Sequence, residues 1–160
     1  MEYNIKAIIF AVCALAVTVY LIVAAIEDGR DMEVTRGKHL IGLIPAVMVW
    51  LLYIGERDLF DVGIVALFIG LWMLCGWTKV YGMADGFVFS NLTLFWGGIG
   101  GAAGVGMVIL IMVLAGFSGM VEILVRKLVT RNCFKENRKI AFVPHILVGY
   151  ICNFLVALIF

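Results

Sequence analysis

The sequence predicts an all-α, polytopic integral membrane protein with six transmembrane helices. Two properties of the whole chain indicate this class: 64% of its 160 residues are hydrophobic, and its mean hydropathy is +1.12. A soluble domain is usually only about 45–50% apolar. With 14% charged residues and a net charge of +1, the composition favours a lipid bilayer as partner and gives no sign of nucleic-acid binding. We expect one membrane-embedded domain over residues 1–160.

Long apolar runs place the six helices, because about 20 apolar residues are needed to cross the hydrocarbon core. The expected spans are residues 5–26, 39–54, 59–77, 85–96, 102–125 and 140–160. The fourth and fifth must be separate, because residues 86–121 carry no charge and would form one helix about 54 Å long. The core is only about 30 Å thick. Glycine permits a turn, so we expect the break within the run 97–101.

Lysine and arginine set the expected orientation, because these residues gather in cytosolic loops. With six spans, the loops after the first, third and fifth helices hold three, one and six of the 12 basic residues. Only Lys6 and Arg57 lie on the other side. We therefore expect a multi-pass protein of the cell (cytoplasmic) membrane with both termini outside. Asp28, near the end of the first helix, and Asp85, at the start of the fourth, then share the cytosolic face.

Two acids at one membrane face suggest a carboxyl dyad. Acids in membrane segments are costly and mark functional sites, and paired carboxylates can share one proton and activate water. Helix dipoles disfavour a charge on Asp28 and favour one on Asp85, so we expect Asp85 to be the ionised base. Two alternatives stay open. Both acids are solvated interfacial charges, or Asp31 replaces Asp28 as the partner of Asp85.

The sequences around both acids resemble those of the type IV prepilin peptidases, which are polytopic aspartic proteases. Residues 82–85 (Gly-Met-Ala-Asp) resemble the Gly-x-Gly-Asp motif of that family, and the alanine resembles its archaeal preflagellin peptidase branch. Asp28 is followed by Val-Thr at 34–35, where the family has Ile-Pro or Val-Pro. Residues 141–144 (Ala-Phe-Val-Pro) and 147–150 (Leu-Val-Gly-Tyr) are similar to its final helix.

Several positions depart from the family pattern. Thr35 stands where the family has proline, Arg36 where it has asparagine, and Phe87 where it often has lysine. Many bifunctional members also carry a cytosolic domain with paired Cys-x-x-Cys motifs, linked to N-methylation. The four cysteines of this sequence form no such pair, so we expect proteolysis without that domain.

The resemblance implies a membrane aspartic endopeptidase in which Asp28 and Asp85 are catalytic. Gly82 and Ala84 would let the loop that carries Asp85 approach the first helix. The implied partner is a pilin-like or flagellin-like precursor, whose basic leader peptide is removed at the cytosolic membrane face. No metal or organic cofactor is expected. A broader intramembrane aspartic protease and a non-enzymatic polytopic membrane subunit remain alternatives.

Overall fold

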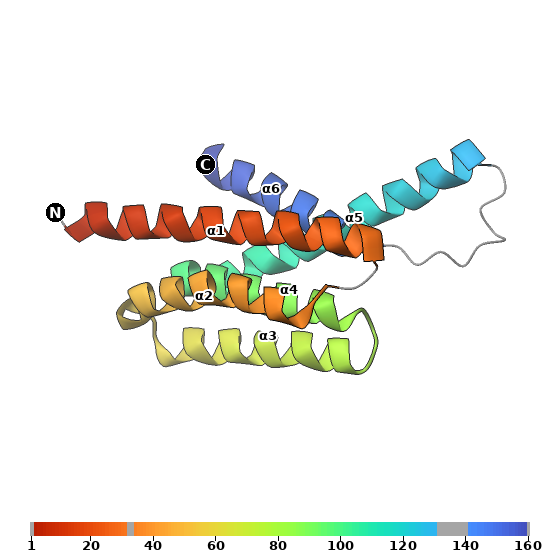
Figure 1. Ribbon diagram of the computed structural model, residues 1–160. Helices are drawn as coiled ribbons and strands as arrows, with labels where there is room; N and C mark the ends of the chain where they lie inside the picture. The colour runs from red at the N-terminus through yellow and green to blue at the C-terminus, as the bar shows by residue number, and fades with distance from the viewer. Residues whose placement is uncertain (1, 32–33, 131–140, 160) are drawn as a thin grey trace.

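Figure 1 shows the protein in a computed structural model, which describes residues 2–31, 34–130 and 141–159. The described residues form α-helices and one turn of 3-10 helix, which confirms the all-α prediction for this part of the chain. The helices are α1 (Glu2–Asp31), α2 (Arg36–Tyr53), α3 (Leu59–Trp77), α4 (Met83–Gly100), α5 (Ala102–Thr130) and α6 (Val143–Ile159), and the 3-10 turn is Ile54–Glu56.

Successive helices run in alternating directions, and α4 lies at the centre of the bundle (Figure 1). It packs against α2, α3 and α5, while α1 packs against α2 and α6. α6 also packs along α5. Both chain ends therefore lie toward one end of the bundle. The opposite end gathers the ends of α1, α3 and α5 and the beginnings of α2, α4 and α6.

Four of the described helices are long and apolar enough to cross a membrane. The stretches are Ile5–Asp31 in α1, Gly37–Glu56 in α2 and the 3-10 turn after it, Leu59–Trp77 in α3 and Ala102–Leu128 in α5. The membrane character of the prediction is thereby confirmed, but α4 and α6 fall outside this set. α4 is less apolar because its side chains face other helices, and it buries Asn91 and Thr93 as well as large apolar residues.

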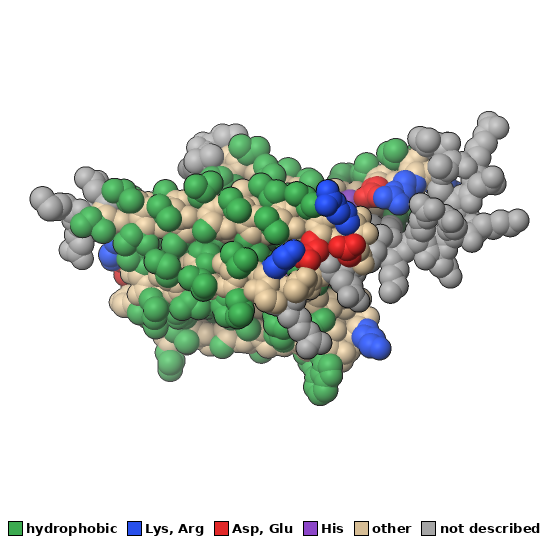
Figure 2. Space-filling view, in the orientation of Figure 1, with side chains coloured by type: hydrophobic (Ala, Val, Ile, Leu, Met, Phe, Trp, Pro, Cys, Tyr) green, Lys and Arg blue, Asp and Glu red, His purple; other side chains and the backbone are tan. Residues whose placement is uncertain are grey.

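The outer surface of the bundle is largely apolar. Figure 2 shows hydrophobic side chains spread along the helices, with acidic and basic side chains gathered near the end where α1 stops. Leu15 of α1, Ile44 of α2 and Leu67 of α3 are each more than 60% exposed. Such faces suit contact with lipid, because burying apolar surface away from water is favourable.

The chain turns between α4 and α5 at Gly101, the last residue of the predicted glycine run. Its φ of +55° is a left-handed conformation that glycine adopts without a steric penalty. Asp61 Oδ1 of α3 accepts a hydrogen bond from Ala102 N–H at 2.8 Å. Arg57 lies four residues before Asp61, and its Nε donates to Gly98 O at 3.1 Å. The beginning of α3 and the residues before it thus supply partners for backbone groups that both helix ends leave unpaired.

A buried polar cluster joins α1, α2 and α4. Tyr20 Oη of α1 lies 2.8 Å from His39 Nδ1 of α2. Asn91 Nδ2 of α4 donates to His39 O at 3.0 Å. All three side chains are buried, and buried polar groups need such partners because they have lost water. The cluster fixes α1 and α4, which carry the two predicted acids, relative to each other through α2.

Candidate active site

Asp28 lies in the last turn of α1, because this helix continues past the expected end at residue 26 and stops at Asp31. Its side chain is 7% exposed. Oδ2 accepts a hydrogen bond at 3.0 Å from the backbone N–H of Val143, the first residue of α6. N–H groups in a first helical turn have no partner within their own helix. The start of α6 therefore supplies a free donor that holds the Asp28 carboxylate.

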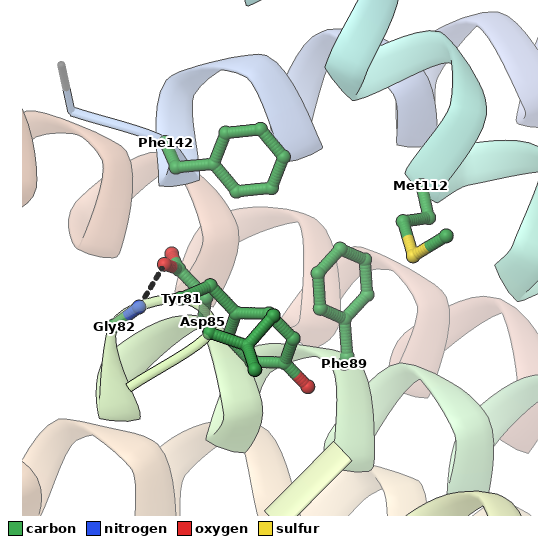
Figure 3. A pocket seen from close by; sticks show the side chains of 7 residues that line it. Tyr81, Gly82, Asp85, Phe89, Met112 and Phe142 are labelled. Carbon is green, nitrogen blue, oxygen red and sulfur yellow. Dashed lines mark hydrogen bonds between the residues drawn. The ribbon is translucent and has the colours of Figure 1, made fainter. Parts of the chain in front are cut away.

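Asp85 is the third residue of α4 and is also 7% exposed. Its Oδ2 accepts a hydrogen bond from Gly82 N–H at 3.1 Å, as the dashed line in Figure 3 marks. An acid in the first turn of a helix is favoured by the helix dipole. Local sequence thus explains why a carboxylate is tolerated at this position, and the bond fixes its direction.

The charges of Asp28 and Asp85 interact at the end of the bundle where α1 stops and α4 begins. Asp85 lies outside the four candidate spans. Burial, followed by the charge of Asp28, raises the pKa of Asp85 to about 7, and the hydrogen bond from Gly82 opposes the rise. The proton on the pair is therefore exchanged near neutral pH, and the titration belongs to both carboxyls together.

The expectation that Asp85 is the ionised base concerns how the pair divides its one proton, whereas the raised pKa of Asp85 describes the pair as a whole. The dipole of α4 does favour the charged form, but its effect is typically below about 1 kcal/mol at exposed positions. Desolvation of a carboxyl that is 7% exposed is the larger effect here. Near neutral pH the pair as a whole therefore readily holds one proton.

A pocket of about 430 Å³ opens beside Asp85 (Figure 3). Its lining residues are Val80, Tyr81, Gly82, Asp85, Phe89, Met112 and Phe142. Among these described residues, Asp85 supplies the one carboxyl group. Tyr81 Oη donates to the carbonyl oxygen of Trp72 at 2.7 Å, which orients the phenol. The pocket thus presents a carboxyl group within an apolar wall, an arrangement that suits an apolar side chain lying next to a polar bond.

Gly82 and Ala84 lie on either side of Met83 just before Asp85, and Gly82 is the N-cap of α4. Gly82 has φ −64° and ψ +146°, which any residue can adopt. A Cβ atom at this position would lie 3.0 Å from Asp85 Oδ2. Glycine here leaves room for the Asp85 carboxylate to fold back on its own N-cap, and the approach to α1 does not use it. Ala84 packs against the hydrophobic core.

The alternative acid Asp31 is exposed at the end of α1. Its neighbour Glu27 takes part in a link to α2. Thr35 Oγ1 donates to Glu27 Oε1 at 2.6 Å, and Lys38 Nζ lies 2.8 Å from the same oxygen. Thr35, where the family has proline, therefore ties the beginning of α2 to α1 through a side chain. Asp28 is buried whereas Asp31 is exposed, so Asp28 is the acid on the inner side of α1.

Sequence reasoning missed the contributions of α6 and of the aromatic wall. The Val143 N–H group reaches Asp28 across 115 positions of the chain, and no local pattern indicates that pairing. Phe142 beside it and Phe89 of α4 line the pocket. The available signal was the Pro144 at the start of the last span, because proline favours the first turn of a helix.

Comparison with known proteins finds no matching family model, no matching curated protein and no matching solved structure. Within the described ranges, no group of three or more His, Cys, Asp or Glu residues is placed to hold a metal ion. The chemistry of the site must therefore be inferred from its own residues. Asp28 and Asp85 form a coupled pair of buried carboxyls beside an apolar pocket.

Proposed function

We propose that this chain is a membrane aspartic endopeptidase that removes the basic leader peptide of pilin-like or flagellin-like precursors at the cytosolic membrane face. One observation carries the proposal. Two acids predicted from sequence to share a membrane face are both buried, lie on different helices at one end of the bundle, and interact electrostatically. Solvated interfacial charges would not be buried in this way. The resemblance at residues 82–85 and around Asp28 then supplies the class of substrate.

The mechanism follows from a pair that holds one proton. The ionised carboxyl takes a proton from water while the water oxygen attacks the scissile carbonyl carbon. The protonated carboxyl donates to the carbonyl oxygen as the tetrahedral species forms. Collapse of that species breaks the C–N bond, and the leaving nitrogen receives a proton from the pair. The backbone donors at Val143 and Gly82 keep the two carboxyls oriented through the cycle.

In this proposal α4 and α6 also cross the membrane, which gives six spans with the first turn of α4 at the cytosolic surface. The alternating helix directions support it, and so does the sequence, in which ten of the 12 basic residues fall in the loops after the first, third and fifth expected spans. A reporter fused after residue 160 should be external, and one within 126–139 should be cytosolic. A cytosolic C-terminus would contradict six spans.

Cleavage of a purified precursor tests the function itself. The purified chain in detergent micelles should release the basic leader of a pilin-like precursor, and mass spectrometry of both products should place the cut before the hydrophobic helix. A cut inside that helix would instead favour a broader intramembrane protease. Failure to cut any pilin-like or flagellin-like precursor, with helical content intact by circular dichroism, would favour a non-enzymatic membrane subunit.

A further inference from the structure

A second buried polar cluster lies at the same end of the bundle, between α5 and α6, and takes no part in the chemistry above. His145, in the first turn of α6, is 6% exposed. Its Nδ1 lies 2.9 Å from Ser118 Oγ of α5. Its Nε2 lies 2.8 Å from Glu122 Oε2, one turn further along α5. The same Glu122 carboxylate pairs with Arg126.

The chemistry of these partners determines how the imidazole is held. A bare Nε2 lone pair facing an ionised carboxylate would be repelled, so Nε2 carries a proton while Glu122 is ionised. The N–H does not point along the line to Oε2, so this contact is an electrostatic pair and not an aligned hydrogen bond. Nδ1 and the Ser118 hydroxyl supply the directed bond, in which the hydroxyl donates to a neutral ring or accepts from a charged one. The imidazole is therefore held at both ring nitrogens, by a directed bond at Nδ1 and by a charge at Nε2.

The position of His145 connects this cluster to Asp28. Two residues earlier, Val143 N–H donates to Asp28 Oδ2, and His145 N–H donates to Phe142 O at 3.0 Å within the same turn. One turn further on, Gly149 brings the two helices close, since a Cβ atom there would lie 2.6 Å from Ile111 O. That approach fixes the middle of α6, and His145 fixes its beginning.

We propose that His145 is a positioning residue of the peptidase. Through Ser118 and Glu122 it fastens the first turn of α6 to α5, so that the Val143 N–H group stays directed at Asp28. The charged groups that face this turn are Glu122 and Arg126 on α5, Asp28 on α1 and, across the pocket, Asp85 on α4. The inference rests on the proposed function, because the carboxyl it positions is the one assigned to hydrolysis.

Amide hydrogen exchange tests the link without using activity. In His145→Gln and Ser118→Ala, the peptide that covers 141–146 should exchange about tenfold faster than in the wild type, because the Val143 N–H opens more often. Ser90→Ala is the matched control, since Ser90 Oγ donates within its own helix, to Gly86 O at 2.7 Å. Unchanged exchange at 141–146 in both α5–α6 variants would overturn the proposal.

Cleavage kinetics then separate positioning from simple structural support. His145→Gln should lower kcat about tenfold with KM unchanged. It should also move the acid limb of the pH–rate profile up by about one pH unit, because a donor to the carboxylate favours its charged form. Val143→Pro removes that donor directly, and proline is accepted at the first helical position. Val143→Pro should move the acid limb of the pH–rate profile by the same amount. The variant that carries both Val143→Pro and His145→Gln should move it no further. Faster exchange without a displaced limb would overturn the positioning role.

The two proposals fail in distinguishable ways. If the wild type cleaves no precursor while exchange at 141–146 still rises in His145→Gln, the proposed function is overturned and the positioning role falls with it. If the wild type cleaves the precursor and His145→Gln matches it in kcat and in both limbs of the pH–rate profile, only the positioning role of His145 is overturned.

Discussion

Asp28→Asn and Asp85→Asn are each expected to reduce the rate of leader cleavage at least about 10³-fold, because each removes one half of the acid–base pair. Asn keeps the size and the acceptor oxygen of Asp, so the bonds from Val143 and Gly82 can persist. Asp31→Asn is the matched control, since Asp31 lies three residues from Asp28 on the same helix but is exposed. It should keep most of the activity. A dead Asp31→Asn beside an active Asp28→Asn would show that the partner acid is misassigned.

Stability distinguishes loss of chemistry from loss of fold in these variants. The pKa of Asp85 is raised from 3.8 to about 7, so its contribution to stability is fully present below about pH 4 and is lost as pH rises to about 7. That loss amounts to a few kcal/mol at most, at about 1.4 kcal/mol per unit difference in pKa. The asparagine side chain of Asp85→Asn does not titrate. The Tm of this variant in detergent should therefore exceed that of the wild type at pH 8, by more than at pH 5.

The second large effect is the pH dependence of cleavage. The active pair holds one proton, so the rate should fall on the acid side when the pair takes a second proton and on the alkaline side when it loses the first. The pKa of Asp85, raised by burial and then by the charge of Asp28, places the alkaline limb near pH 7. Above that value the rate should drop about tenfold per pH unit. The maximum should lie on the acidic side of neutrality.

Much of the fold could be predicted because its signals are local. Apolar runs and their polar breaks located all six helices, and the glycine run located the turn at Gly101. Counting alternating spans was enough to place Asp28 and Asp85 at one end, since a helix that ends there must be followed by one that begins there. The helix ends were less predictable. α1 continues to Asp31, past the apolar run, and Asp28 in its last turn bonds to the start of α6.

The parts of the site that escaped prediction depend on packing between distant segments. Helix dipoles at Asp28 and Asp85 can be read from a sequence, whereas the burial that raises the pKa of Asp85 cannot. The Val143 donor and the His145 cluster likewise arise only when α6 lies between α1 and α5. The resemblance included residues at the start of α6 but did not indicate the contacts that they make.

The initial rate of cleavage of one purified precursor, followed from about pH 4 to pH 9 in a single detergent, is the most direct test of a carboxyl pair that shares one proton. Circular dichroism at each pH should confirm that the helices are intact. We expect a bell-shaped profile whose alkaline limb lies near pH 7 in the wild type, with no measurable cleavage at any pH in Asp28→Asn or Asp85→Asn. A wild-type rate that stays flat through both limbs would contradict a pair of carboxyls that shares one proton.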